Sequence, residues 1–428
     1  MATRQTAWRI NLTGSAVGLA CLGLWLSLSG SATAAPPDWV ELGPAPIITG
    51  AYTGRVSALA CSPTNPDKYY AAGADGGVWR TYDAGESWTP LTDFLPTSAM
   101  GALAMDPTDE NVLYAGTGEA NFANHSRYGL GLYRTTDGGD TWDQLAEEAF
   151  AGRCFSRIVV DSLDPATLYA AITHAGGFPA GVAARGHPAT WGPLGVFRST
   201  DRGETWTHLT NGLPAISATD LAIDPVNPQV LYAAIGDIFG EPENGIYKST
   251  DGGEHWDRLY GGLPTSGVGR ISLAISPSKP TVLYTIYTYA STSTGGGAST
   301  LNVYRTDNGG ASWTALNPGN FQATYGWYLS TVIVHPAEED TVFVGGLDLL
   351  RTTSGGGYWS YVTPPHVDMH ALAWDAAGRL VVGDDGGVHR TTNLGGSWTS
   401  HNQGLGCIQF YAGLSLSPAA PQYLYGGT

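Results

Sequence analysis

The chain has 428 residues, with 20 Lys and Arg against 37 Asp and Glu, and a formal net charge of −17. This acidic balance argues against nucleic acid and anionic membrane surfaces as partners. Beyond the first 34 residues the only cysteines are Cys61, Cys154 and Cys407. Disulfide bonds are therefore not the framework of the fold, and at least one of these thiols is unpaired within the chain.

The first 34 residues are typical of a secretory signal peptide. Arg4 and Arg9 flank the start of an apolar run, LTGSAVGLACLGLWLSLSG, and the small residues Ala32–Ala34 supply a cleavage position. A membrane anchor is the alternative, but prolines follow the run at once. Cleavage near Ala34 leaves 18 basic and 37 acidic residues, a net charge of −19, in a mature chain 35–428 that is secreted, periplasmic or held at the cell surface. No later apolar run approaches the roughly 18 residues that span a membrane.

A short motif that ends in tryptophan recurs seven times. Its pattern is Ser/Thr-x-Asp-x-Gly-x-Ser/Thr-Trp, and successive tryptophans lie 39 to 64 residues apart, a period typical of stacked supersecondary units. Six copies carry an acid or amide at the third position: Asp83, Asp137, Asp201, Asp251, Asn308 and Asn393. The copy RTTSGGGYW carries neither. Glycines suit a tight turn, and the Asp side chain can accept hydrogen bonds from turn amides, so we expect the motifs to be structural.

The sequence between the motifs predicts four short strands in each period. A strand such as LGLYRT precedes each motif, a strand begins at its Trp, and two apolar strands joined by a turn lie upstream, as in LAIDPVNPQVLYAAI. No segment predicts a convincing helix. Four-stranded units repeated around an axis form a β-propeller, so we predict an all-β fold.

We expect seven complete blades plus a partial eighth. IQFYAGLSLSPAAPQYLYGGT at the C-terminus reads as two strands of an eighth unit without its motif. Either the segment at Trp39 completes that blade or the chain is part of a longer protein, and the second interpretation is favoured.

These motifs match the Asp-box, or BNR, signature, and the chain from about Trp39 onward resembles the secreted BNR-repeat propellers. That group includes xyloglucanase-type glycoside hydrolases, sialidases, sortilin-type receptors and photosystem assembly factors. The resemblance implies the fold but leaves the function open. We expect a propeller that binds, and in one version hydrolyses, a polysaccharide or glycoconjugate. The alternative is a non-catalytic platform for a protein partner, and no cofactor is expected.

Function is expected on the face opposite the motifs. In an alternating blade the hairpins between strands one and two and between three and four share one end, and the other loops share the other. The long insertions all fall between strands two and three. Long loops on one face of a rigid ring favour a binding surface, although tolerated surface insertions explain them as well.

These loops supply the candidate ligand-binding residues. Their aromatic residues are Phe122, Tyr128, Trp191, Phe239 and Tyr287. The charged candidates are Glu119, Arg127 and an aspartate expected at position 236, at the start of the loop GDIFGEPENG. Aromatic faces beside carboxylates and amides suit sugar rings or peptide chains.

The segment HVDMHALAWD contains three polar residues two apart, His366, Asp368 and His370. On an extended strand all three point to the same side. They are candidate ligand-binding residues and a weak candidate metal or proton-transfer cluster, with a water-bridged channel lining as the favoured alternative.

Two acids are weak candidates for catalysis. Glycoside hydrolysis needs two carboxyl groups at one bond. In xyloglucanase-type enzymes the first acid precedes a Gly-Gly before the third strand of a blade, and Asp75 and Asp385 occupy similar strings here, one residue closer to the glycines. The second acid of that family lies in a second propeller. Arg55, Arg157 and Arg270 begin or precede first strands, where an arginine lining or structural salt bridges account for them equally. No Arg-Ile-Pro string occurs, which disfavours a sialidase.

Overall fold

The computed structural model describes residues 52–177, 192–292, 296–362, 364–409, 415–417 and 420–425. The expected signal peptide, Trp39 and Trp191 lie outside these residues. Among the described residues, no helix is both long and apolar enough to cross a membrane. The described chain is nearly all β, and α1 (Glu147–Phe150) is a single turn that buries Phe150.

Seven four-stranded antiparallel sheets follow one another along the chain, which confirms the predicted β-propeller. The first three blades comprise β1 (Val56–Cys61), β2 (Tyr69–Gly73), β3 (Gly77–Thr81), β4 (Thr89–Pro90); β5 (Met100–Asp106), β6 (Asp109–Thr117), β7 (Leu132–Thr135), β8 (Asp143–Leu145); β9 (Arg153–Val160), β10 (Leu168–His174), β11 (Gly195–Ser199) and β12 (Thr207–Leu209).

The other four blades continue the pattern. They comprise β13 (Ala218–Ile223), β14 (Leu231–Ile235), β15 (Gly245–Ser249), β16 (Asp257–Arg258); β17 (Val268–Ile275), β18 (Leu283–Tyr289), β19 (Thr300–Thr306), β20 (Thr314–Ala315); β21 (Thr331–Val334), β22 (Val342–Gly345), β23 (Leu349–Thr352), β24 (Ser360–Tyr361); β25 (Met369–Trp374), β26 (Leu380–Asp384), β27 (Gly387–Thr391) and β28 (Thr399–Ser400). In each blade the strands pair in sequence order, so every neighbour is a hairpin partner.

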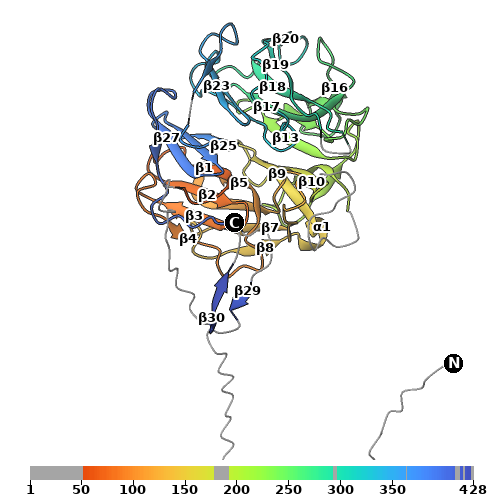
Figure 1. Cartoon of the computed structure of the whole chain (residues 1–428). Helices are drawn as coiled ribbons and strands as arrows, with labels where there is room; N and C mark the ends of the chain where they lie inside the picture. Colours follow the sequence, from red (N-terminus) through yellow and green to blue (C-terminus); the bar gives the residue numbers. More distant parts are fainter. Residues whose placement is uncertain are drawn as a thin grey trace, which may run out of the picture. The chain divides into compact units, whose positions relative to one another are not determined.

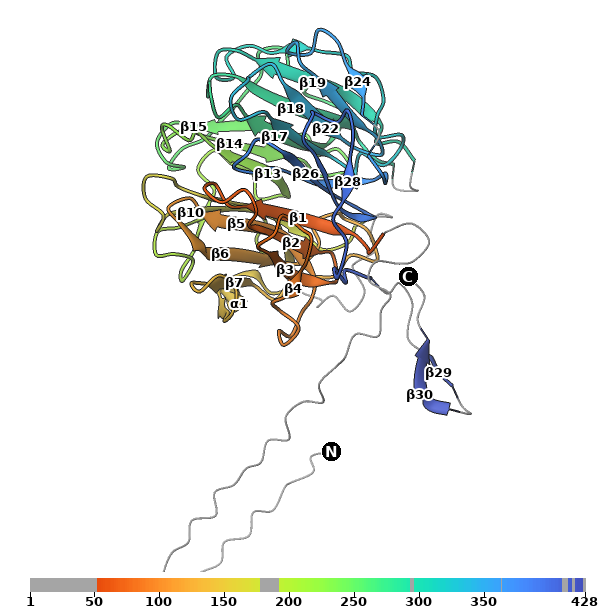
Figure 2. The same cartoon turned by 90° about the vertical axis from the view of Figure 1, so that its left-hand side faces the viewer.

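The seven blades close into a ring. The first strand of each blade contacts the first strand of the next, and β25 of the last blade contacts β1 of the first. Figure 1 shows the two ends of the colour range side by side at this seam, and Figure 2 shows the same seam from a second direction. Thr53 Oγ1 accepts a hydrogen bond from the Cys407 amide at 3.2 Å, and Trp88 Nε1 donates to the His401 carbonyl at 2.8 Å. The segment after β28 is thereby tied to the first blade.

The segment predicted to begin an eighth unit forms a two-stranded sheet, β29 (Ser415–Ser417) with β30 (Ala420–Tyr425). The seven complete blades close the ring without it. The three cysteines outside the expected signal peptide are free thiols.

The repeated motifs form the hairpins between the third and fourth strands, and the second blade shows their geometry. Thr135 Oγ1 donates to Asp137 Oδ1 at 2.7 Å and accepts from the Gly139 amide at 2.8 Å. The Thr141 amide and hydroxyl both donate to the Asp137 carboxylate, at 2.9 and 2.6 Å. Gly139 has φ of 104°, a left-handed conformation that favours glycine, and a Cβ there would lie 2.5 Å from Leu91 Cδ1. The bond from the third-strand hydroxyl to the Asp or Asn side chain, and the bond from the later amide to the same oxygen, recur in five other motifs, two of which carry Asn308 and Asn393. In the remaining motif Ser354 takes this position.

Apolar residues from neighbouring blades pack together between the sheets. One such cluster joins Tyr169 of β10, Leu221 of β13 and Trp256, the last residue of a motif. Trp256 is buried, and its Nε1 donates to the Gly253 carbonyl at 3.0 Å. The motif tryptophan therefore fixes the turn and fills the space between two blades at once. This packing makes the ring a rigid support for the loops at its other end.

Candidate functional site

The insertions predicted between the second and third strands are found there, between β6 and β7, β10 and β11, β14 and β15, and β18 and β19. Because the strands of each blade are antiparallel, these loops leave the end of the blade opposite the motif turns. Contacts between blades agree with this placement. Tyr70, at the start of β2, bonds to the motif residue Gly138, whereas Arg55, just before β1, bonds to residues in the loops after β6 and β26.

Arg55 is the centre of a charged cluster at this loop end. Its Nε and Nη2 donate to the two oxygens of Asp385 at 2.8 and 3.3 Å, and its Nη1 donates to Glu119 Oε1 at 2.8 Å. Nη1 also donates to Gln409 Oε1 at 3.0 Å, and the guanidinium lies 5.1 Å from the ring centre of Tyr328. One arginine of the first blade thus joins carboxylates of the second and seventh blades. Glu119 is completely buried, whereas the Asp385 side chain is 25% exposed.

A hydrogen-bond chain fixes the proton on His370. Arg270 Nη1 can only donate, so it meets Asn121 Oδ1, at 3.4 Å. Asn121 Nδ2 then donates to Glu119 Oε1 at 3.2 Å and to His370 Nδ1 at 3.2 Å. Because Nδ1 accepts, the ring proton is on Nε2, which lies 2.9 Å from Asp385 Oδ1 and donates to it. His370 and Arg55 Nε therefore share Asp385 Oδ1, and together they orient this carboxylate.

These contacts decide the charges of the carboxyl groups. Burial raises the pKa of Asp385, but His370 and Arg55 outweigh burial and hold this pKa well below its usual range. Burial likewise acts against the charged form of Glu119, yet Arg55 and His125 lower its pKa. Burial alone would lower the pKa of Arg55, and Glu119 and Asp385 raise it instead. Both carboxylates are ionised near neutral pH.

The carboxyl group of Asp368 lies beside this cluster, and its pKa is shifted in the opposite direction. Burial and the charge of Asp385 raise the pKa of the Asp368 carboxyl. Within the described chain no side chain or amide donates a hydrogen bond to it. The residue is partly buried and has φ of 68°, a left-handed conformation that is uncommon outside glycine. Its amide donates to the Leu347 carbonyl at 3.2 Å, which anchors this backbone to the preceding blade.

The predicted row of His366, Asp368 and His370 on one strand is wrong. Strand β25 begins at Met369, and the left-handed turn at Asp368 breaks the alternation before it. The His366 ring packs edge-on against Tyr52, with ring centres 4.9 Å apart, while His370 faces Asp385. No group of three metal-binding side chains occurs among the described residues, which removes the candidate metal cluster.

Asp75 occupies the same position in the first blade as Asp385 does in the seventh, but its surroundings differ. Arg127 Nε donates to Asp75 Oδ2 at 2.6 Å, and the Ser98 hydroxyl donates to Asp75 Oδ1 at 2.9 Å. Two predicted site residues are therefore engaged with each other, Arg127 as the half-exposed partner of an ion pair. Among the described residues neither of these two side chains bonds to the Arg55 cluster, although the Glu119 amide donates to the Arg127 carbonyl at 3.0 Å.

The acidic candidate expected at position 236 is wrong by one residue. That position is Gly236, and the aspartate of this loop is its neighbour Asp237. A Cβ at Gly236 would lie 2.8 Å from both the Ile271 nitrogen and Thr219 Oγ1, so no side chain fits there. Asp237 Oδ2 lies 3.8 Å from His174 Nε2, and the described structure shows no bond from this carboxylate to the Arg55 cluster. Neither position 236 nor Asp237 therefore belongs to the cluster.

The predicted aromatic residues are dispersed. Tyr128 packs beside Ala120 and Cys154. Phe122 and Tyr287 are fully buried, so the expectation that they form an exposed aromatic surface is wrong.

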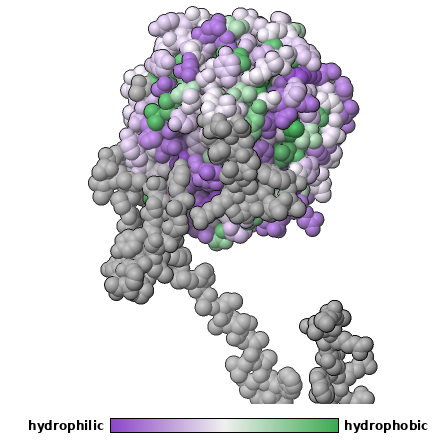
Figure 3. Space-filling view, turned by 45° about the vertical axis from the view of Figure 1, so that its right-hand side comes forward, coloured by the Kyte–Doolittle hydropathy of each residue, from purple (hydrophilic) through white to green (hydrophobic). Residues whose placement is uncertain are grey.

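Other tyrosines are exposed at the loop end instead. Tyr289 ends β18 beyond a shift of register between Tyr287 and Thr288, and it is 50% exposed. Tyr325, in the loop before β21, is 47% exposed. Figure 3 shows hydrophilic and hydrophobic residues interspersed on one face of the molecule.

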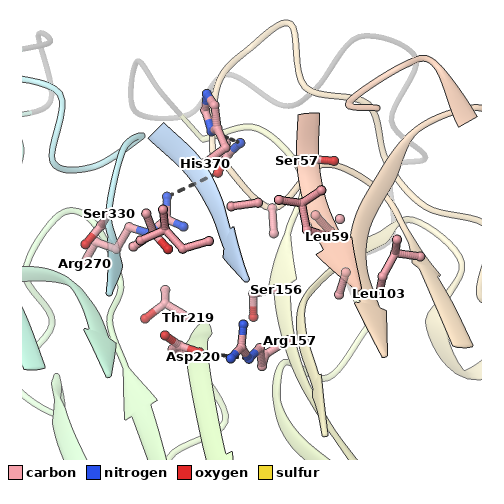
Figure 4. A pocket seen from close by; sticks show the side chains of 18 residues that line it. Ser57, Leu59, Leu103, Ser156, Arg157, Thr219, Asp220, Arg270, Ser330 and His370 are labelled. Carbon is pink, nitrogen blue, oxygen red and sulfur yellow. Dashed lines mark hydrogen bonds and ion pairs between the residues drawn. The ribbon is translucent and has the colours of Figure 1, made fainter. Parts of the chain in front are cut away.

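The first strands of all seven blades surround a polar channel next to the cluster. Its wall includes Ser57, Ser156, Asp220 and Arg270, and Asn121 and His370 belong to both the channel and the cluster. Figure 4 shows Arg270 and Arg157 reaching into this space from different blades, with Thr219 and Asp220 between them. Asp220 Oδ1 lies 3.6 Å from Arg157 Nε.

Sequence reasoning missed Asn121, His125, Tyr328 and Gln409, and it gave Arg55 and Arg270 only as structural or lining arginines. The signal for the two arginines was present, since a Gly-Arg pair precedes or opens the first strand of three blades, at Arg55, Arg153 and Arg270. All three arginines are buried. Buried arginines at the same place in several blades indicate a polar centre that must be matched by acceptors.

Comparison with known proteins gives relatives among the xyloglucanases, and no family model matches the chain. A xyloglucanase from Paenibacillus sp is 31% identical over 206 residues, which cover 44% of this chain and 18% of that protein. A probable oligoxyloglucan-reducing end-specific xyloglucanase from Neosartorya fischeri is 26% identical over 226 residues, 49% of this chain and 25% of that protein. The matched segments thus span a quarter or less of these relatives.

Solved structures give the same likeness at the level of the fold. A GH74 enzyme from Niastella koreensis has a TM-score of 0.61 and 20% identity, covering 82% of this chain and 55% of that chain. A GH74 xyloglucanase from Xanthomonas campestris has a TM-score of 0.61, 18% identity and coverages of 83% and 55%. YCF48 bound to D1 peptide has a TM-score of 0.51 and 15% identity, covering 79% of this chain and 92% of that one. The predicted resemblance to xyloglucanase-type propellers is confirmed, and the chain is a glycoside-hydrolase-like propeller.

Proposed function

We propose that this propeller is a secreted protein that binds a polysaccharide on its loop end and hydrolyses it at the Arg55 cluster. The observation that carries the proposal is the Asp385 carboxylate, partly exposed and held by Arg55 and His370. A fixed anion at an open site suits hydroxyl recognition and stabilisation of the positive charge that develops on a cleaved sugar. The xyloglucanase relatives support a β-glucan with substituted side chains, such as xyloglucan, as the polysaccharide.

Two carboxyl groups, those of Asp385 and Asp368, are suited to different roles in the proposed hydrolysis. The Asp385 carboxylate has three hydrogen-bond donors and stays ionised, whereas the Asp368 carboxyl has none within the described chain and retains its proton more readily. Environments that push two pKa values apart separate an acid from its partner carboxylate. We assign Asp368 as the group that protonates the glycosidic oxygen as its bond to the anomeric carbon breaks. Asp385 is assigned as the carboxylate that stabilises the positive charge on that carbon, until a water molecule adds to it and returns a proton to Asp368.

Asp75 is not part of this assignment. Both of its oxygens accept hydrogen bonds, from Arg127 and Ser98, whereas the Asp368 carboxyl accepts none among the described residues. Tyr289 and Tyr325 supply exposed aromatic faces on the fifth and sixth blades, where sugar rings can stack. The long polymer would extend from these tyrosines toward Asp385.

The test is sugar release from xyloglucan and from unsubstituted β-glucan, measured with the purified chain beside affinity electrophoresis on the same polymers. We expect retention and release by the native chain. Asp385→Asn should lose release by at least about a hundredfold, and Asp257→Asn, an exposed carboxylate at the motif end, should change neither. Absence of both retention and release on all polymers would overturn the proposal. Capture of a peptide or protein partner under those conditions would favour an interaction platform instead.

A further inference from the structure

Arg270 is a buried cation without a counter-ion of its own in the described part of the chain. It lies on β17, inside the ring, and is 8% exposed. Its Nη1 donates to the Tyr328 carbonyl at 2.7 Å and more weakly to Asn121 and the Trp327 carbonyl, all neutral groups. Its Nε has no hydrogen-bond partner among the described residues, and no carboxylate oxygen there forms an ion pair with it within 4.0 Å.

The acid nearby, Asp220, already forms an ion pair with another arginine. Asp220 pairs with Arg157 and accepts hydrogen bonds from the Leu221 and Leu273 amides at 2.9 and 3.0 Å. Two arginines therefore share one carboxylate in the described wall of the channel. Burial lowers the pKa of Arg270 to about 10, so it stays charged at neutral pH. A buried guanidinium without a matching anion is costly, and a bound anion removes that cost.

The hydroxyl groups of the channel wall determine which polar groups a bound anion can carry. Ser156 Oγ donates to the Ala218 carbonyl and Thr219 Oγ1 donates to the Ile271 carbonyl, each at 2.6 Å. Because each hydroxyl has one proton, these oxygens can meet a ligand in the channel only as acceptors. Beside the cation, the wall thus offers acceptors to a ligand that carries hydroxyl donors.

We propose that the axial channel binds a sugar acid, with its carboxylate on Arg270 and its hydroxyl groups donating to the side-chain oxygens of the channel wall. A carboxylate satisfies the guanidinium, and adjacent hydroxyls match the Ser and Thr acceptors. Asn121 contacts both Arg270 and His370, so the ligand would lie next to the Arg55 cluster without touching Asp385. This site does not depend on hydrolysis.

The experiment measures the melting temperature and calorimetric binding of the full chain with glucuronate, acetate and glucose at constant ionic strength. We expect glucuronate to bind at least about tenfold more tightly than acetate, and glucose not to bind. The matched variants are Arg270→Met, which should abolish glucuronate binding, and Arg305→Met, which removes an arginine that pairs with Asp307 and Asp340 outside the channel and should retain it.

Several outcomes overturn the proposal. Equal affinity for acetate and glucuronate would show that the site binds anions without recognising the sugar. That result would contradict the proposed sugar-acid ligand. No binding of either anion, or binding that survives Arg270→Met, would contradict a site at Arg270. If Arg270→Met does not fold, a crystal structure of the native chain with glucuronate decides, since only water beside Arg270 overturns the assignment. Failure here leaves polysaccharide release by Asp385 untouched, so the two proposals fail separately.

Discussion

His370 Nε2 lies 2.9 Å from Asp385 Oδ1 and donates its proton to that carboxylate. His370 lies on β25 and Asp385 in the loop after the adjacent strand β26, yet the histidine is oriented by Asn121 of the second blade. The carboxylate is in turn held by Arg55 of the first blade. Three blades at the seam of the ring thus fix one partly exposed oxygen pair, which is the preorganisation a binding or catalytic carboxylate needs.

His370→Gln and His370→Leu separate this positioning role from packing. A glutamine can present an amide donor near the position of Nε2, whereas leucine cannot. We expect Gln to keep a substantial part of polysaccharide release and Leu to reduce kcat by about ten- to a hundredfold with little change in KM. Equal losses in both variants, or a loss confined to KM, would contradict the positioning role.

Removal of the buried charge at Glu119 should cost far more stability than removal of a surface charge. Glu119 is completely buried against Arg55, so Glu119→Gln leaves the guanidinium with less compensation, and we expect a loss of about 3 kcal/mol. The control Asp75→Asn breaks an ion pair whose arginine is 48% exposed and should cost under about 1 kcal/mol. Urea unfolding measures the loss of stability in both variants. Similar losses would contradict the central role of Arg55 in the charged cluster.

Stability should fall in acid because Glu119 and Asp385 have lowered pKa values. A group with a lowered folded pKa stabilises above its unfolded pKa, and that contribution disappears as pH falls through the folded value. Both groups therefore contribute fully above about pH 5 and progressively less below about pH 4. Unfolding midpoints followed from pH 7 to 2.5 check this. A Glu119→Gln, Asp385→Asn double variant should show a flatter profile in that window.

The contribution of Asp368 to stability should change with pH in the opposite direction. Its folded pKa is raised, so its favourable contribution exists below the unfolded pKa and is lost as pH rises through the folded value. Asp368→Asn removes a poorly solvated charge and should raise the melting temperature at pH 7 while lowering release of sugar. Below about pH 4 the stability difference should vanish. Activated aryl glycosides, whose leaving groups need no proton, should remain substrates of Asp368→Asn but not of Asp385→Asn.

The motif turns should affect stability alone. Asp137 closes its hairpin through Thr135 and Thr141 at the end of the blade opposite Arg55. We expect Asp137→Ala to lower the melting temperature by a few degrees while polysaccharide retention by the folded fraction is unchanged. Reduced affinity in the folded protein would show that the motif end takes part in binding.

The fold was predictable because its signals are local and repeated. Each motif combines at least one turn-forming glycine with a tryptophan that packs between blades, as Gly253 and Trp256 show, and seven copies define seven blades. The insertions were placed correctly for the same reason, since strand order within a blade follows sequence order. Asp385 and Glu119 were found as acids one and two residues after second strands.

The contacts that bring the site residues together were not predictable, because they depend on closure of the ring. Arg55 and Asp385 are 330 residues apart and meet only because β25 lies beside β1. The expected row at His366, Asp368 and His370 failed on a single backbone angle, the φ of 68° at Asp368, which period-two reasoning does not contain. The aromatic prediction failed at β18 in a similar way, since the sequence does not mark the shift of register that separates buried Tyr287 from exposed Tyr289.

The most direct measurement of the central claim is hydrogen exchange of the backbone amides with and without xyloglucan oligosaccharide. We predict protection in the loops before β1, β21 and β25 and after β6 and β26, with no change at the turns that end in Trp88, Trp142, Trp206, Trp256, Trp313, Trp359 and Trp398. Protection confined to those turns would place recognition on the wrong end of the ring and contradict the account.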